Sequence, residues 1–354
     1  MPISAPDAVQ PAFRHAKEQL TQPFRFSQWW RLAIVGLLAG EMGSMNGCNF
    51  NYPMNTQRPP SQHFLAGGLP GLWAANPALF IGLIAAAALV SIGLVVLFTY
   101  ISSVMRFILF DSIVSRECHI RQGWSRRQGP GYKLFLWQLL LMAATFAALA
   151  IVIGIPALCA WGLGWFADAR SHVMGLVLGG IACFLLLVFL FLFVGVVWVM
   201  TKDFVVPQMA LENISAVEGW RRLWMWLKFD KLGYAGYIGM KIVLAIGAAI
   251  ATVIVTLIAF VLLLIPIGGV AVGVLFGGKA AGWTWNPYTI TLAVIVGCVV
   301  LAILIFAAAM ISVPVIVFFP AYSIYFFASR YTQLASLLWP EPPPSPAPAP
   351  AAPG

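Results

Sequence analysis

The chain has 354 residues, of which 61% are hydrophobic and only 9% are charged, and its formal net charge is +9. Because a soluble domain carries roughly 25% charged residues, so few charges cannot cover a water-exposed surface. The composition therefore excludes an ordinary soluble protein, and the basic balance requires no nucleic acid, since a basic face against anionic lipid explains it.

Long uncharged stretches predict an all-α, polytopic membrane protein. The stretches without Asp, Glu, Lys or Arg are 77–105, 134–167, 171–201, 242–278 and 280–329. A helix that spans a bilayer needs about 20 such residues. We expect a membrane helical bundle of about six transmembrane helices, with interfacial amphipathic helices and an internal repeat of two-span hairpins.

Three regions follow one another along the chain. Residues 1–27 are polar, predict a cytoplasmic segment with an amphipathic helix, and lack the apolar core of a signal peptide. Residues 28–338 are expected to form the six-span domain. Residues 339–354 are rich in Pro and Ala and predict a disordered, polyproline-like tail.

The six spans are expected, in chain order, at about 29–45, 77–104, 133–158, 173–200, 234–265 and 288–313. The first is the shortest, and Trp29 and Trp30 stand at its membrane boundary, a depth that tryptophan favours. Residues 46–75 predict a polar outer loop. The glycine-rich residues 266–287 predict another outer loop, with a segment that dips back into the membrane as the alternative.

Basic residues set the expected orientation, because Lys and Arg resist translocation. With six spans, seventeen of them fall on one side: Arg14, Lys17, Arg25, Arg31, Arg106, Arg116, Arg121, Arg126, Arg127, Lys133, Lys202, Arg221, Arg222, Lys228, Lys231, Lys241 and Arg330. Three fall on the other: Arg58, Arg170 and Lys279. We therefore expect an integral protein of a bacterial inner (plasma) membrane with both termini in the cytoplasm.

A repeated motif supports an internal repeat. The stretch "RQGWSRRQGPG" returns as "VEGWRRLWMW", and aligning their tryptophans also pairs Arg106 with Lys202. Each copy follows one span and leads into another. "FFPAY" at 318–322 resembles "VVPQM" at 205–209 and suggests a third copy. The interpretation is a chain of three units of about 100 residues, each an interfacial helix and a hairpin.

The repeated motif predicts two lipid anchors on the cytoplasmic leaflet. The candidate residues are Trp124, Arg126, Arg127, Trp220, Arg221 and Arg222. Tryptophan supplies depth, and the arginines face anionic headgroups, which are the expected partners. Gly123 and Gly219 would let each helix approach a neighbouring span. The alternative is that the arginines only fix topology.

The order span, "DFVVP", amphipathic helix, "GWRR", span resembles a group of uncharacterised bacterial and archaeal membrane proteins. That group is similar to the membrane domain fused to some glycerophosphodiester phosphodiesterases. The resemblance covers most of residues 10–335. It implies a six-span module without assigned chemistry, because phosphodiesterase activity in such fusions belongs to a separate soluble barrel that this chain lacks.

Few residues predict chemistry. Four histidines and five cysteines match no metal motif, and GxSxG and phosphate-loop patterns are absent, so we expect no catalytic residues, cofactor or metal. Charges inside spans would point to a transport path. Glu41, expected near the outer end of the first span, is the one candidate polar membrane site, whereas Asp111, Asp203 and Lys241 are interpreted as boundary charges with local partners.

Three classes of function remain open. The first is a non-enzymatic membrane module that binds lipids or a membrane protein partner, and the interfacial helices favour it. The second is a transporter or channel component, which hairpin repeats favour but scarce mid-membrane polar groups oppose. The third and least favoured is a lipid-modifying enzyme, which would need clustered His, Asp or Glu at one membrane face.

Overall fold

The computed structural model describes residues 3–41, 77–165, 170–280 and 287–339, and every secondary-structure element in these ranges is helical. The predicted all-α, polytopic class is confirmed, because five of these helices are long and apolar enough to cross a membrane. They are α5 (Pro77–Val114), α6 (Ile120–Gly162), α7 (Val173–Met200), α10 (Lys231–Ala280) and α11 (Pro287–Ala328). The protein is therefore an integral membrane protein.

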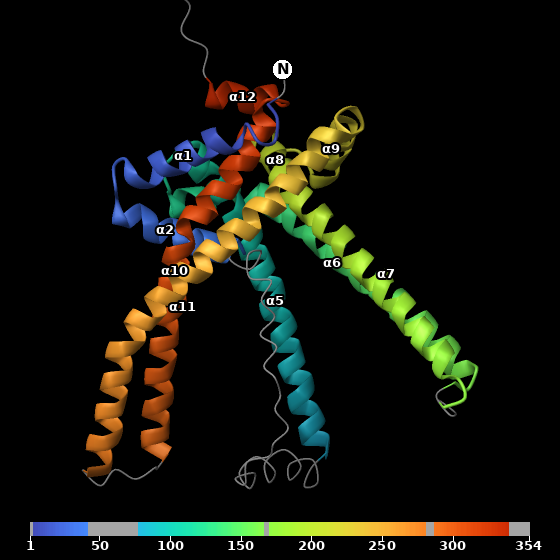
Figure 1. Cartoon of the computed structure of the whole chain (residues 1–354), viewed down its shortest axis with the longest axis vertical. Helices are drawn as coiled ribbons and strands as arrows, with labels where there is room; N and C mark the ends of the chain where they lie inside the picture. Colours follow the sequence, from blue (N-terminus) through green and yellow to red (C-terminus); the bar gives the residue numbers. More distant parts are fainter. Residues whose placement is uncertain (1–2, 42–76, 166–169, 281–286, 340–354) are drawn as a thin grey trace, which may run out of the picture.

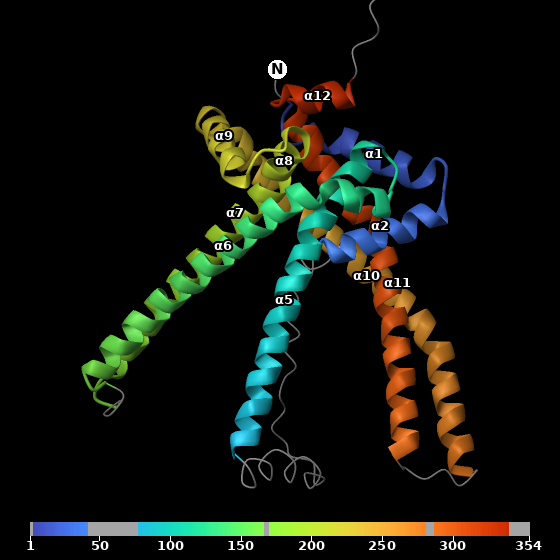
Figure 2. The same ribbon diagram turned by 180° about the vertical axis from the view of Figure 1, so that it is seen from behind.

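The long helices meet at one end and diverge at the other as three legs (Figure 1). One leg is α5, one is the hairpin of α6 and α7, and one is the hairpin of α10 and α11. The shorter helices gather where the legs meet, an arrangement also seen from behind in Figure 2. They are α1 (Val9–Thr21), α2 (Phe26–Leu38), α8 (Val206–Glu212), α9 (Ala216–Phe229) and α12 (Thr332–Leu338). We call these helices and the adjoining ends of the long helices the junction.

The core lies in the junction rather than in the legs. Its largest fully buried side chains are aromatic, and they include Phe107, Phe204, Tyr237, Tyr322 and Phe326. In the most apolar stretches of the legs, almost no residue is buried within the protein. Such continuous apolar surface is stable only in hydrocarbon, which is the physical reason that these legs belong in a bilayer.

The described part of the first predicted span, residues 29–41, contains no helix long enough to cross. Helix α2 has 13 residues and ends at Leu38, so it is about 20 Å long, whereas the hydrocarbon core is about 30 Å thick. Gly40 follows with a φ of 76°, a left-handed conformation that ends a helix. Residues 42–76, which include the rest of that span and the predicted loop 46–75, lie outside the described residues.

Two other predicted boundaries are wrong. The first repeat copy has no separate interfacial helix, because α6 is one helix of 43 residues that begins at Ile120 and continues through Pro130. Residues 266–280, expected in an outer loop, are helical, since α10 continues past Pro266 to Ala280. Residues 281–286 of that predicted loop, and the tail from 340 onward, lie outside the described residues.

A buried histidine ties the N-terminal helix to two legs. His15 of α1 is 3% exposed; its Nε2 lies 3.0 Å from the carbonyl oxygen of Ile113 in α5, and its Nδ1 lies 3.3 Å from the Tyr325 hydroxyl in α11. With Nε2 protonated, the neutral ring donates to the carbonyl and accepts from the hydroxyl. Burial, aided by the positive charge of Arg116, lowers the pKa of His15 below its ordinary value.

Candidate functional site

A π-helical turn sets the geometry of the most deeply buried charges. Helix α7 passes into the π-helix η1 (Thr201–Val205) just before Pro207 of α8. Proline has no backbone N–H and cannot donate to the carbonyl of Asp203 four residues earlier, so the regular helical ladder is interrupted there. Such π-turns are frequent at functional sites. The turn carries Lys202 and Asp203, and these neighbours contact different helices.

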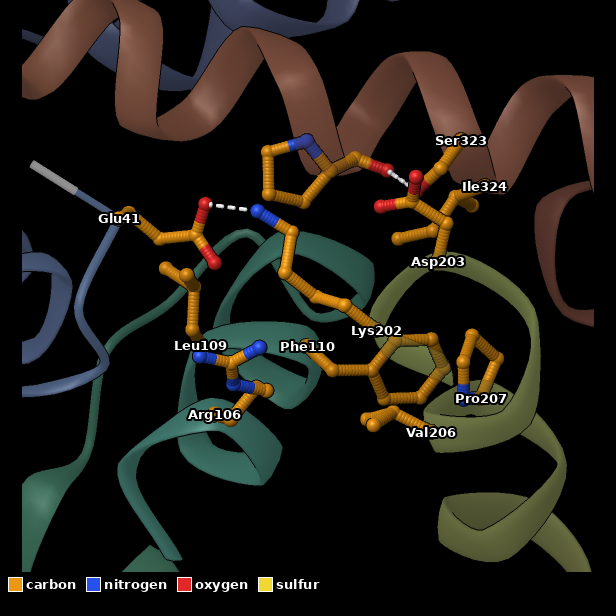
Figure 3. A pocket seen from close by; sticks show the side chains of 11 residues that line it. Glu41, Arg106, Leu109, Phe110, Lys202, Asp203, Val206, Pro207, Ser323 and Ile324 are labelled. Carbon is orange, nitrogen blue, oxygen red and sulfur yellow. Dashed lines mark hydrogen bonds and ion pairs between the residues drawn. The ribbon is translucent and has the colours of Figure 1, made fainter. Parts of the chain in front are cut away.

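Five charges meet at this turn, three of them buried and two nearly so, and we call them the charge cluster: Glu41, Arg106, Lys202, Asp203 and Lys241. Lys202 Nζ donates to Glu41 Oε2 at 2.5 Å, just after α2 (Figure 3). Asp203 accepts a hydrogen bond from Lys241 of α10 and another, at 2.9 Å, from the Tyr237 hydroxyl. The charge cluster thus joins α2, α5, η1 and α10.

The third cation of the charge cluster makes no ion pair with a carboxylate of the described residues. Arg106 donates to the carbonyl oxygen of Ala39 at 2.7 Å, and its guanidinium lies 4.6 Å from the centroid of the Trp198 ring. Its Nε has no hydrogen-bond partner among the described residues. Three cations and two carboxylates leave the charge cluster with one net positive charge.

Burial makes these charges energetically significant. Glu41, Arg106 and Asp203 are 5%, 6% and 2% exposed. Removing an ion from water costs several kcal/mol even after relaxation, and pairing offsets that cost only when the geometry is good. Beside Arg106 and Lys202 is a cavity of about 30 Å³, which has room for a water-sized group (Figure 3).

The predicted position of Glu41 is wrong. It was expected near the outer end of a span, but it lies in the junction against Lys202, because α2 ends before it can cross. The expected local partners are wrong as well. Asp203 pairs with Lys241, 38 residues away, and Lys241 is held in this pair rather than reaching for the membrane surface.

Arg127, one of the predicted lipid anchors, faces the protein interior. Its guanidinium makes two hydrogen bonds of 2.6 Å to the carboxylate of Asp111 at the end of α5, and it donates to the carbonyl oxygen of Ala210 at 2.7 Å. Its side chain is 11% exposed. This arginine therefore connects α5, α6 and α8, and it does not face lipid as the expected anchor would.

The other residues of the first motif are more accessible. Arg126 is exposed. Trp124 is half-buried and packs edge-on against Tyr100 of α5, with ring centroids 6.2 Å apart. Gly123 faces Ile108 of the same helix, where an added Cβ would lie 3.1 Å from a side-chain carbon. The close approach expected at this glycine is therefore present.

The second motif lies on the separate amphipathic helix α9. One face of α9 is buried against the junction through Ala216, Gly219 and Leu223. A Cβ added at Gly219 would lie 2.7 Å from Val205 Cγ1, so only glycine fits there without movement. The Trp220 indole donates to the Thr201 hydroxyl at 3.0 Å, which links this helix to η1.

The two arginines of the second motif have different surroundings. Arg222 is bound to Glu212 at 2.5 Å and to Glu218 at 3.2 Å, and its side chain is 31% exposed. Hydrogen bonds from Arg221 and Arg222 hold the pKa of Glu218 below its ordinary value. Arg221, with a side chain 74% exposed, points away from the protein. Arg221 is thus accessible to lipid, and Arg222 is largely engaged within the chain.

The outward face of α9 combines apolar and basic side chains, and we call it the basic face: Val217, Arg221, Trp224 and Lys228. Val217 and Trp224 are 63% and 58% exposed, and Lys228 Nζ lies 5.9 Å from the centroid of the Trp224 ring. Phe229 at the end of the helix is 91% exposed. Aromatic and basic side chains of this kind occupy the headgroup level of a membrane.

Among the described residues, five helices long and apolar enough to cross a membrane, a junction with buried charge pairs and an amphipathic helix at the same end define a helical integral membrane protein. Its family is also shown: residues 3–337 match a family of unknown function (DUF7544), and the chain belongs to that family. No curated protein and no solved structure matches the chain. The resemblance to the membrane domain of glycerophosphodiester phosphodiesterases stays a prediction.

Proposed function

We propose that this protein is a non-enzymatic membrane module that binds anionic lipids at the cytoplasmic leaflet. The basic face of α9 carries the proposal. Its four residues recur at positions i, i+4, i+7 and i+11, so they lie on one side of the helix, while Ala216, Gly219 and Leu223 hold the other side against the protein. An outward stripe of this composition suits the headgroup layer rather than water or hydrocarbon.

The expected selectivity can be estimated from the charges. A basic residue at an anionic membrane surface contributes on the order of 1 kcal/mol. Arg221 and Lys228 would together contribute about 2 kcal/mol, which corresponds to a roughly 30-fold preference for anionic over zwitterionic lipid. Salt screens this attraction over about 8 Å at physiological ionic strength. The preference should therefore fall as salt is added.

The proposal puts the junction in the cytoplasm. In support, α1, α9 and α12 all lie at the junction (Figure 1), and the charge cluster joins the ends of α2, α5 and α10 there. Cytoplasmic leaflets are the anionic ones, and basic segments are retained on that side. Both termini would then be cytoplasmic, in the inner (plasma) membrane of a bacterium.

The test is a lipid-competition measurement on the full chain in nanodiscs. Spin-labelled phosphatidylglycerol and phosphatidylcholine report the lipids in contact with the protein. The variant carries Arg221→Gln and Lys228→Gln, two exposed changes on one helix face. We expect the preference for phosphatidylglycerol to fall by about tenfold or more, in line with two lost surface charges.

A matched variant removes the same number of charges elsewhere in the junction. Arg14→Gln with Lys17→Gln alters two exposed residues of α1 and leaves α9 intact. We expect this variant to keep most of the preference. An α9 variant with unchanged selectivity would defeat the proposal, and equal losses in the two variants would show that net charge, rather than the basic face, attracts the lipid.

A further inference from the structure

An apolar groove lies between α7, α10 and α11 and has a volume of about 320 Å³. Its walls are apolar side chains, among them Phe191, Val196, Ile242, Val315 and Phe319. One end of the groove reaches the charge cluster, where Glu41, Lys202 and Lys241 are part of the lining. The groove is thus apolar along its length and charged at one end.

The charged end favours an anion. It presents two ammonium groups and one carboxylate, and the complete charge cluster carries one net positive charge. Each ammonium has three N–H donors and meets one carboxylate among the described residues: Glu41 for Lys202 and Asp203 for Lys241. A further monovalent anion would balance the charge cluster and accept hydrogen bonds from both lysines.

The limited access to the charged end restricts that anion. The side chains of Lys202 and Lys241 are only 11% and 13% exposed, and that of Glu41 is 5% exposed. A compact group therefore fits there better than a glycerophosphate carrying two chains. The groove volume is at the lower end of the range of about 300–1,000 Å³ that is usual for small-molecule sites.

We propose that the groove binds a long-chain carboxylate, a fatty acid, with its alkyl chain between α7 and α10 and its carboxylate at Lys202 and Lys241. The alkyl chain of the fatty acid moves from the hydrocarbon of the bilayer into an equally apolar groove, so its transfer contributes little to the free energy of binding. Selectivity comes from the carboxylate, because charge-assisted hydrogen bonds are strong where water is excluded. This site is separate from the basic face of α9 and does not depend on it.

The first experiment measures binding of radiolabelled palmitate to the full chain in phosphatidylcholine nanodiscs. We expect saturable binding of one palmitate per protein. Hexadecanol has the same chain length and no charge, and it should bind at least tenfold more weakly. Equal binding of the two compounds would overturn the proposal, since the charged end would then have no part in recognition.

A substitution that fills the groove tests its location. Gly195 of α7 lines the groove, and a Cβ added there meets no heavy atom within 4 Å, so Gly195→Phe places a ring in the groove without displacing the backbone. Palmitate binding should weaken at least tenfold. Gly180→Phe on the same helix is the control, because Gly180 is exposed, equally open and not part of the groove lining.

The remaining outcomes separate this site from other lipid contacts. Wild-type affinity in Gly195→Phe, or an equal loss in Gly180→Phe, would overturn the assignment to the groove. Loss of palmitate binding in the Arg221→Gln, Lys228→Gln variant would locate the ligand at α9 and overturn it as well. Native mass spectrometry that finds a two-chain phospholipid, retained by wild type and lost in Gly195→Phe, would overturn the fatty-acid assignment.

Discussion

Replacing Arg127 by glutamine should destabilise the junction strongly, although the sequence predicted that this residue belongs to a lipid anchor. The change removes two hydrogen bonds to Asp111 and one to the carbonyl oxygen of Ala210. Breaking a buried ion pair from one side costs about 3–5 kcal/mol, because the other charge stays buried without its partner. The Asp111 side chain is 30% exposed, so the low end applies, about 3 kcal/mol.

That loss corresponds to a roughly 150-fold increase in the equilibrium constant for unfolding. Unfolding in mixed micelles of dodecyl maltoside and sodium dodecyl sulfate, followed by tryptophan fluorescence, measures it. Arg126→Gln is the matched control, because Arg126 is the neighbour of Arg127 in the chain and is exposed. This substitution should change the free energy of unfolding by less than about 0.5 kcal/mol, which is the usual limit for surface substitutions. Equal effects of the two substitutions would refute the structural role of Arg127.

Two further predictions concern the junction. Because burial lowers the pKa of His15, the folded state favours the neutral ring, and stability should fall as pH drops from about 6.5 towards 5. The His15→Gln variant should lack this part of the pH dependence of unfolding. A pH profile of unfolding that is the same in the variant and the wild type would contradict this prediction. Gly219→Ala should destabilise by about 1–3 kcal/mol, because the new methyl overlaps Val205, and Val205→Ala should restore much of the loss in the same unfolding assay. Gly129→Ala, where an added Cβ meets nothing within 4 Å, is the control and should show no such loss.

The sequence predicted the class of fold because membrane insertion leaves a direct compositional record. Runs of 20 or more uncharged apolar residues have few physical alternatives to a spanning helix, and five of the predicted spans coincide with long helices. The order of elements along the chain also indicated an amphipathic helix in the second repeat copy, where α9 lies.

Boundaries that depend on tertiary contacts could not be predicted in the same way. Residues 120–132 carry a Gly-Trp motif with paired arginines like that of α9, but they form the first turns of the long helix α6, and Arg127 packs against a carboxylate from α5. Residues 266–280 are rich in glycine, which suggested a loop, yet the helix continues through them. Local composition is the same whether a glycine lies in a loop or in a helix, and whether an arginine is exposed or buried. Only the packing of the folded protein distinguishes these cases.

The charge cluster was only partly visible in the sequence. The sequence identifies three of its charges as lying near or within apolar stretches: Glu41, Asp203 and Lys241. Their pairing joins residues 161 and 38 positions apart, and no periodicity reports contacts of that kind. The available signal was Lys241 itself: a lysine two turns inside a span requires a counterion, and Asp203 was among the few acidic residues within reach.

The basic junction is proposed to face the cytoplasm, and labelling of single cysteines determines which side of the membrane it occupies. Single cysteines at Thr21→Cys, Glu117→Cys and Ser171→Cys, in a chain without its five native cysteines, would be treated with a membrane-impermeant maleimide. All three positions are exposed, the first two in the junction and the third at the far end of the α6–α7 leg. With a cytoplasmic junction, only Ser171→Cys should be labelled in intact cells, and the other two should react after permeabilisation. Labelling of Thr21→Cys or Glu117→Cys in intact cells, with Ser171→Cys protected, would contradict it.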